Sequence, residues 1–369
     1  MKKQILFLVM AFIASISVAW GQGAKTKSAP QASSWVPDAL HPVAGVPYVY
    51  KATVTPSPGT YEWWATKDAN FITAPNTTNM STYLKSPTTT VTGTDLITQS
   101  TNYAKTGQTS DQVTITWGDV VLNTTKYQTV PGATPSPTFV VVRYVSGGTE
   151  CADNLKVYEL DPINAFTVDI KNIDAADFSS KGYGVSVNQC PANVSKATYV
   201  NKAMVYEYGI NYLYYEVVAA NFSSYWVPTF TLTGKHAQQT YAVEYTYADP
   251  STWTATPPTW TAVVNGTTHF NVDPTVTTTA GGVSVFIRVT LTNNNYEGLA
   301  LRTITLAADG QNSVGTWDII NSATTCTATA AADSNDLASQ DIKARPTVPS
   351  TTTSTTAPNT TLVTGNNVN

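Results

Sequence analysis

The sequence predicts an all-β protein with two tandem β-sandwich domains, and three observations lead to this prediction. Short runs of alternating apolar residues recur along the chain, and Pro, Gly, Asn and Thr separate them as turns would. No amphipathic helix pattern stands between these runs, which is typical of a sandwich. Hydrophobic residues make up 42% of the 369 residues and charged residues only 12%, so cores can form while Thr, Asn and Ser solvate the surface.

Residues 1–21 have the pattern of a secretory signal peptide. A basic start, Met1-Lys2-Lys3, precedes an apolar stretch over residues 5–16 that is too short to cross a membrane. Ala19 and Gly21 are the small residues expected before a cleavage site. We expect cleavage before Gln22, export to the cell surface, the extracellular space or the periplasm, and no membrane span in the mature chain.

The first domain is predicted over residues 46–161, after a linker rich in Ser, Ala and Pro at residues 22–45. A long Thr- and Asn-rich tract at residues 70–110 is predicted as a loop or insertion that carries at most short edge strands. The predicted strands of this domain cover residues 48–54, 61–65, 113–117, 139–145 and 155–160.

The second domain is predicted over residues 162–345. Hairpin-like joins are expected at Gly209 and at Asn293-Asn294-Asn295, and only residues 328–338 have a weak helical tendency. Residues 346–369 are dominated by Thr, Ser, Pro and Asn and are predicted to be disordered. The predicted strands cover residues 166–170, 203–208, 211–219, 229–233, 241–247, 259–264, 283–292 and 301–307.

Part of the chain resembles a known family. The YEWWA strand at residues 61–65, the VTITWG strand with Trp117 and the hairpin VVVRYVSGGTECADNLKVYEL resemble the Ig-like and PKD-like repeats of secreted Bacteroidota proteins, over about residues 46–170. The resemblance implies adhesion or scaffolding at the surface or outside the cell, and it brings no catalytic residues. The second domain, with about eight strands, exceeds a minimal immunoglobulin domain, so larger Ig-like or jelly-roll-like packing is expected.

The charge pattern argues against nucleic acid and anionic membranes as partners. The formal net charge is −4, and cleavage removes Lys2 and Lys3, which leaves 18 basic and 24 acidic residues and a net charge of −6. No block of Lys or Arg occurs that could form a footprint on nucleic acid or on acidic lipids.

Three cysteines, Cys151, Cys190 and Cys326, allow one disulfide and one remaining thiol, or a bridge between molecules. We favour Cys190–Cys326, because both lie near the ends of the second predicted domain. Cys151–Cys190, across the domain junction, is the alternative. None of the three has the C-x-x-C spacing of a redox or metal motif.

The residues that support catalysis are few. His41, His236 and His269 are the only histidines, and no G-x-S-x-G, H-E-x-x-H or H-x-E motif occurs. Scattered carboxylates predict solvated strand edges rather than a catalytic pair, and they are Glu62, Glu216, Glu244, Asp249, Glu297 and Asp309. We therefore expect no enzymatic activity.

A structural calcium ion is the one cofactor that the sequence offers. Asp333, Asp336 and Asp341, with Asn335 between them, are oxygen ligands at short spacing, although the order of an EF-hand loop is missing. The competing interpretation is a solvated acidic loop, which we favour.

Aromatic residues are abundant, with 9 Trp, 20 Tyr and 10 Phe. Most are expected in cores, but Trp253 and Trp260 flank Pro257-Pro258, and Trp226 precedes Pro228. Exposed rings on a rigid scaffold can stack on sugars, so these three tryptophans are candidates for glycan binding. The alternative is that they cap the ends of the sandwich.

Together these features predict a non-catalytic exported protein that acts in adhesion, scaffolding or self-assembly. Its expected partners are other surface proteins, glycans or copies of itself. A carbohydrate-binding module that uses the three tryptophans is the alternative.

Overall fold

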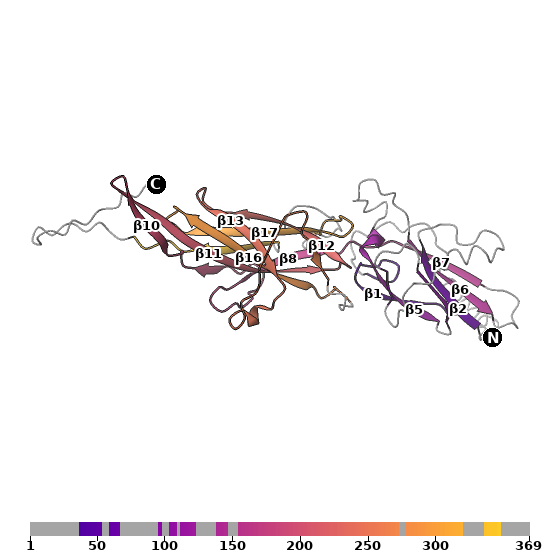
Figure 1. Cartoon of the computed structure of the whole chain (residues 1–369). Helices are drawn as coiled ribbons and strands as arrows, with labels where there is room; N and C mark the ends of the chain where they lie inside the picture. Colours follow the sequence, from indigo (N-terminus) through magenta and orange to yellow (C-terminus); the bar gives the residue numbers. More distant parts are fainter. Residues whose placement is uncertain are drawn as a thin grey trace, which may run out of the picture.

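The structure is a computed structural model of the chain. It describes residues 37–53, 59–66, 95–97, 103–108, 111–122, 138–146, 154–272, 278–319 and 336–347. Within these ranges the helical elements are two short 3-10 helices, η1 (Asp119–Leu122) and η2 (Pro250–Thr252), and every other regular element is a strand. The protein is all-β, and its strands form two sandwiches that lie end to end (Figure 1).

The first sandwich packs a three-stranded sheet, in the order β1-β5-β3, against a four-stranded sheet, in the order β4-β2-β6-β7. The predicted hairpin is confirmed, because β6 and β7 pair antiparallel from Thr138↔Leu160 onward. Both strands of the predicted insertion, β3 and β4, lie at sheet edges. The strand bounds are β1 (Pro47–Lys51), β2 (Gly59–Thr66), β3 (Asp95–Ile97), β4 (Tyr103–Gln108), β5 (Gln112–Trp117), β6 (Thr138–Ser146) and β7 (Asn154–Leu160).

Alternation of side chains builds the first core. In β1 and β5 every second residue faces inward, so Tyr50 and Trp117 meet edge to face, and the Trp117 Nε1–H donates to Tyr50 Oη at 2.8 Å. Trp63, from the opposite sheet, is fully buried in the same cluster. Aromatic residues with a polar tip thus fill this small core; the Trp117 tip has Tyr50 as its partner, whereas the buried Nε1–H of Trp63 has no hydrogen-bond partner among the described residues.

The second sandwich is larger. Its six-stranded sheet has the order β10-β11-β16-β13-β14, with β8 also paired to β11, and its five-stranded sheet has the order β15-β12-β17-β18-β9. The strand bounds are β8 (Thr167–Ile173), β9 (Val187–Gln189), β10 (Val194–Val200), β11 (Ala203–Ala220), β12 (Tyr225–Thr233), β13 (Thr240–Thr246), β14 (Thr261–Ala262), β15 (Phe270–Asn271), β16 (Val283–Asn294), β17 (Arg302–Asn312) and β18 (Leu337–Ile342).

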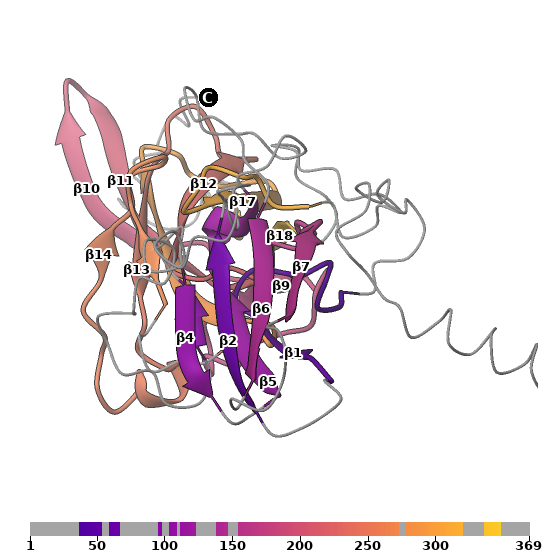
Figure 2. The same ribbon diagram turned by 90° about the vertical axis from the view of Figure 1, so that its right-hand side faces the viewer.

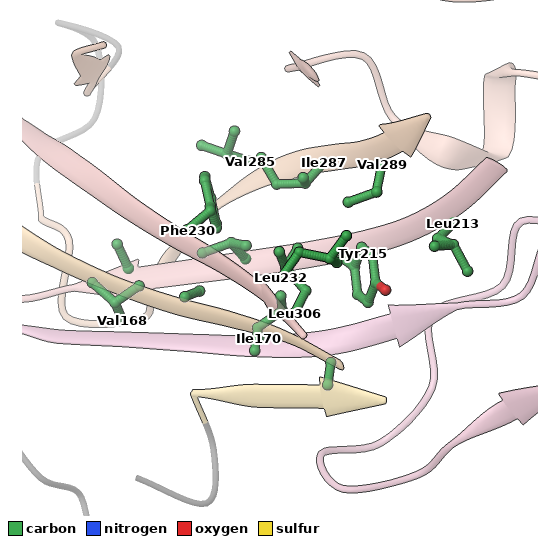
Figure 3. Close-up of a cluster of buried hydrophobic side chains, with 14 of the residues drawn as sticks. Val168, Ile170, Leu213, Tyr215, Phe230, Leu232, Val285, Ile287, Val289 and Leu306 are labelled. Carbon is green, nitrogen blue, oxygen red and sulfur yellow. The ribbon is translucent and has the colours of Figure 1, made fainter. Parts of the chain in front are cut away.

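The core of this sandwich lies between the two sheets (Figure 3). β16 and β11 are neighbouring strands of the six-stranded sheet. Their period-two patterns place Val285, Ile287 and Val289 on the same inner face as Leu213 and Tyr215. Phe230, Leu232 and Leu306 close the core from the other sheet, and burial of such side chains contributes about 1.5–3 kcal/mol each.

The predicted hairpin at Gly209 is wrong, because β11 runs through it as one strand of 18 residues. The register of β11 on β16 continues without a shift from Tyr208 to Ala219, whereas β10 has an irregularity between Val194 and Lys196, opposite Tyr208 and Glu207. The Gly209 N–H donates to the Asn193 carbonyl at 2.9 Å. At this point β11 also exchanges its neighbour β10 for β8 on the same edge.

The join after β16 is a turn, with Asn294 at a φ of 52°, but it does not form a hairpin, because β16 and β17 belong to different sheets. The helical tendency assigned to residues 328–338 is also misleading at its end, where Leu337 and Ala338 begin β18. Gln340 lies buried in this strand, and its amide donates to the Tyr214 carbonyl at 2.8 Å. A buried glutamine and two alanine-sized side chains hide the strand pattern from sequence inspection.

The predicted linker is ordered over residues 37–45 and forms part of the junction between the sandwiches. Val43 and Ala44 are buried, and the Pro42 carbonyl accepts from the Ile163 N–H at 3.0 Å. Gly45 has a φ of +75°, and a Cβ there would lie 2.3 Å from the Phe222 carbonyl oxygen of the second sandwich. The segment is therefore a structural element, and only a glycine fits its last residue.

A buried aspartate fastens the two sandwiches to each other. Asp119, in η1 of the first sandwich, accepts from the Ser223 N–H at 2.9 Å and from the Ser313 hydroxyl at 2.5 Å, both in the second. Its own N–H donates to Ser223 Oγ at 2.9 Å. Val314 packs against the core of the first sandwich, so the contact is apolar as well as polar.

Candidate functional site

The open end of the second sandwich that lies away from the first contains a groove with a volume of about 520 Å³. We call it the distal groove. Three segments line it: the start of β11, the β12–β13 connection and the β16–β17 connection. The lining residues are Met204, Val205, Tyr206, Tyr208, His236, Gln238, Asn295, Tyr296, Glu297, Gly298, Leu299, Ala300 and Arg302.

The groove exists because β11 is longer than the strands around it. The register of β16 on β11 ends at the pair Tyr208↔Asn294, whereas β11 continues back to Ala203. Met204, Tyr206 and Tyr208 thus continue one face of the strand beyond the end of its neighbour. The β16–β17 connection, with Gly298 at a φ of +75°, forms the opposite wall.

Arginine side chains stack on the tyrosine rings of the distal groove. The guanidinium of Arg345 lies 4.5 Å from the centroid of the Tyr208 ring, and that of Arg302 lies 5.3 Å from the centroid of Tyr296. The imidazole ring of His236 also stacks on the Tyr296 ring, and the two ring centroids lie 4.4 Å apart. Burial, together with the Glu297 carboxylate, raises the pKa of Tyr208, so its hydroxyl stays protonated and able to donate.

Backbone hydrogen bonds hold the groove wall in place. The Arg345 N–H donates to the Gly298 carbonyl at 2.7 Å, and its Nε donates to the Glu297 carbonyl at 2.8 Å. Its Nη2 donates to the Ala192 carbonyl, next to β10. Arg345 therefore ties three segments of the distal end together, and the groove has a defined shape before any ligand binds.

Beside the groove, β10 and the first part of β11 form a two-stranded ribbon that projects beyond the sandwich (Figure 2). Its turn places Asn201 and Lys202 at φ values of 53° and 66°, as in a type I′ hairpin. All seven side chains of β10 are exposed.

The three tryptophans predicted for glycan stacking do not form an exposed platform. Trp226 and Trp253 are only 1% and 4% exposed, because Trp226 lies in the sandwich core and Trp253, in the β13–β14 connection, packs against the outer face of the six-stranded sheet. Trp260 is partly buried, and the Arg288 guanidinium covers its ring at 4.6 Å. For Trp226 and Trp253 the prediction is therefore corrected, and the capping alternative describes them better.

Trp253 and Trp260 belong to a second aromatic cluster, on the outer face of the six-stranded sheet. Their rings contact each other at 5.2 Å and Tyr214 at 5.5 and 6.0 Å. Phe178 and Phe286 complete the contacts of Trp253 at 5.2 and 5.9 Å. This cluster, which we call the aromatic cover, shields the outer face from water.

The favoured disulfide is not formed, because Cys190 is exposed and carries a free thiol. Cys151 and Cys326 lie outside the described residues. Cys190 sits in the segment before β10, where its carbonyl accepts from the Asn211 side chain at 3.0 Å.

Of the predicted calcium ligands, the two that the structure describes are not brought together. Asp333 and Asn335 lie outside the described residues, while Asp336 precedes β18 and Asp341 lies near its end. Because a strand rises about 3.3 Å per residue, these two carboxylates lie far apart. Asp341 accepts from the Thr303 hydroxyl at 2.6 Å, and the described residues contain no group of three potential metal ligands.

Sequence inspection missed a buried carboxyl cluster that includes Asp336. Asp309, Asp318 and Asp336 are all nearly inaccessible to solvent. Burial, the hydrogen bond to Asp309 and the nearby carboxylates raise the pKa of Asp318 to about 10. Asp318 and Asp309 therefore share a proton, which removes one charge from the interior.

Other predicted acidic residues serve in ion pairs on the outer sheet face. Glu216 contacts Lys171 at 3.1 Å, and Glu244 contacts Arg288 at 2.8 Å. The cross-strand register places Glu244 directly opposite Arg288, so this pairing follows from the sheet. These ion pairs link neighbouring strands on the outer face of the sheet, and both carboxylates are paired with a cation.

No protein-family model matches the chain, and no curated protein matches it. Within the described residues, no helix is long and apolar enough to cross a membrane.

Proposed function

We propose that the chain is an exported, non-catalytic protein of the cell surface or extracellular matrix that acts in adhesion, scaffolding or self-assembly. The signal-peptide pattern of residues 1–21 and the resemblance to Ig-like and PKD-like repeats of secreted proteins support this proposal. Its mechanism is rigid display, in which two fused sandwiches hold a binding end away from the rest of the molecule.

The observation that carries the proposal is the distal groove with its adjoining ribbon. Both lie at the end of the second sandwich remote from the first, so a partner reaches them without contact with the first domain (Figure 1). Tyrosine and arginine are the residues that dominate protein–protein contacts, and both line this groove. The fixed wall around Arg345 limits the ordering cost of binding.

Carbohydrate binding is the second candidate function. The distal groove is a better site for a sugar than the tryptophans, because Trp226 and Trp253 are buried. Tyr206 and Tyr296 offer ring surfaces, while Arg302, Gln238 and Glu297 offer donors and acceptors for hydroxyl groups. A few convergent polar groups beside aromatic rings are what recognition of a sugar requires.

A bead-retention assay tests the proposal. The mature protein is coupled to beads, and retention is measured on arrayed glycans, on extracellular-matrix preparations and on surfaces coated with the same protein. The double variant Tyr296→Ala/Arg302→Ala removes a stacked pair from the groove and none of the sandwich core. We expect retention to weaken about tenfold or more, which corresponds to about 1.4 kcal/mol.

Tyr241→Ala is the matched control, because Tyr241 is an exposed tyrosine of β13 that does not line the groove. Retention on glycans alone would favour the carbohydrate-binding candidate. Failure of the wild-type protein to bind any of the three surfaces would contradict the proposed function.

A further inference from the structure

The outer edge of β10 is the longest open strand edge of the second sandwich. β10 pairs with β11 on one side, and no described strand lies on its other side. The other terminal strands are short, with two residues in β14, two in β15 and three in β9. The outer edge of β8 is partly covered, because the Lys181 N–H donates to the Asn172 carbonyl at 2.8 Å.

The hairpin geometry determines which backbone groups of β10 point outward. Val200 pairs with Ala203 across the two-residue turn, and in such hairpins this closing pair exchanges hydrogen bonds. Bonded and non-bonded pairs then alternate along the ribbon. The N–H and C=O groups of Tyr199 and Ala197 therefore face away from β11, and no strand among the described residues pairs with them.

The usual protection of an open edge is weak in β10. Natural edge strands carry charged residues, prolines or bulges that prevent pairing with other chains. Among its seven residues, Lys196 is the only charged one, and it pairs with Glu207 of the same ribbon at 3.2 Å. A register shift between Val194 and Lys196 makes the start of β10 irregular, whereas residues 196–200 pair regularly with β11. Tyr199 is 59% exposed, and Val194 and Val200 are 46% and 45% exposed.

We infer that β10 pairs antiparallel with β10 of a second copy of this chain, which joins two six-stranded sheets across a two-fold axis. The inference rests on the proposed function and deepens it by naming a partner for self-assembly. The axis passes beside Ala197, so that Ala197 faces its own counterpart and exchanges both hydrogen bonds with it.

This register is self-complementary. Lys196 lies opposite Thr198 of the other copy, so no like charges oppose each other directly, and both residues belong to the regular part of β10. The outward backbone groups of Ala197 fall at a hydrogen-bonded position, and those of Tyr199 lie opposite Ser195, where the register of β10 on β11 shifts. A two-fold contact of this kind uses the same patch on both molecules and closes at a dimer.

Ala197→Pro tests the pairing selectively. Proline removes the outward N–H of residue 197 and leaves the inward hydrogen bonds of the ribbon in place, which is the arrangement tolerated in edge strands. Light scattering is measured on the mature protein up to about 1 mM, the weak end of specific association. All variants carry Cys190→Ser, because the exposed Cys190 thiol could otherwise crosslink two molecules.

We expect the parent protein to approach twice the monomer mass and the Ala197→Pro protein to remain monomeric. Tyr199→Lys places a charge on the same edge, and we expect this variant to remain monomeric as well. It replaces Ala197→Pro as the test if proline disturbs the ribbon. Tyr241→Lys, on an interior strand of the same sheet, is the control and is expected to dimerise normally. Circular dichroism establishes that each variant is folded.

Hydrogen exchange supplies an independent readout. Peptides that cover residues 194–200 are expected to gain protection as the concentration rises, and this gain is expected to vanish in Ala197→Pro. A monomer at all concentrations, a dimer that survives both edge substitutions, or growth beyond a dimer would overturn the inference. Bead retention on glycans or matrix preparations does not depend on this edge, so its loss would instead count against the proposed function.

Discussion

Asp318 shows how one side chain makes the stability of the second sandwich depend on pH. The Val168 N–H and the Asp309 carboxyl both hydrogen-bond to it, and Asp336 adds a further negative charge nearby. Its folded pKa lies above the unfolded value of 3.8, so folding binds a proton. The contribution of Asp318 to stability is therefore fully present below about pH 4 and is lost as the pH rises toward about 10.

We predict that Asp318→Asn flattens this pH dependence. The amide reproduces the neutral carboxyl without a proton to bind, so the variant should gain about 1–3 kcal/mol at pH 7 and nothing at pH 4. Denaturant titrations at several pH values measure the effect, with Asp341→Asn as a solvent-accessible control from the same sheet. Equal slopes in the wild type and Asp318→Asn would show that Asp318 ionises normally.

At the scale of single elements, the short η2 helix positions the aromatic cover. Asp249 caps this helix by accepting from the Ser251 N–H, and Pro250 begins it. The turn then directs Trp253 inward, where its Nε1–H donates to the Ala248 carbonyl at 3.0 Å. The β13–β14 connection thereby acts as a lid on the outer sheet face.

We predict that Trp253→Ala lowers the free energy of unfolding by about 3–5 kcal/mol, because it opens a cavity among Tyr214, Phe178 and Phe286. Trp260→Ala, which removes a partly exposed ring, should cost about 1–2 kcal/mol. Chemical denaturation of both variants makes the comparison. Similar losses for the two would mean that the cover is not anchored through Trp253.

At the scale of the whole molecule, Asp119 joins the two domains. Burial raises the pKa of its carboxyl, although hydrogen bonds from Ser313 and Ser223 oppose this shift. Residues 104 and 194 positions later in the chain supply these partners. The two sandwiches are thus expected to move and unfold as one unit.

Asp119→Ala should uncouple the domains. The change leaves the buried Ser223 N–H and the Ser313 hydroxyl without their carboxylate, at a cost of about 2–3 kcal/mol. Calorimetry should then resolve two transitions where the wild type has one. Asp111→Ala, which removes only an exposed 3.6 Å ion pair with Lys51, is the control and should keep a single transition.

Several elements were predictable because their information is local. The alternation in residues 113–117 and 283–292 is independent of distant contacts, and β5 and β16 form there. Gly209 and Pro228 misled because each is a turn signal locally, while β11 and β12 run through them. The change of neighbour along β11 from β10 to β8 and the antiparallel register of β12 on β17 depend on partners that the local sequence does not specify.

The candidate site was less predictable than the fold. Met204, Tyr206 and Tyr208 alternate visibly, but only the end of β16 turns that face into a groove wall. Trp226 and Trp253 stood out by residue type and flanking proline, yet both are buried. Exposure of an aromatic residue depends on what folds over it, and neighbouring residues do not determine that.

The sequence by itself determined the all-β class, the hairpin of β6 and β7, and the edge positions available to the 70–110 tract. These follow from side-chain periodicity and turn chemistry, which act over a few residues. The tertiary structure alone decided the inter-sheet path from β16 to β17, the Asp119 junction, the shared proton of Asp309 and Asp318, and the distal groove. Each of these joins residues from separate strands, so each exists only when the sheets have assembled.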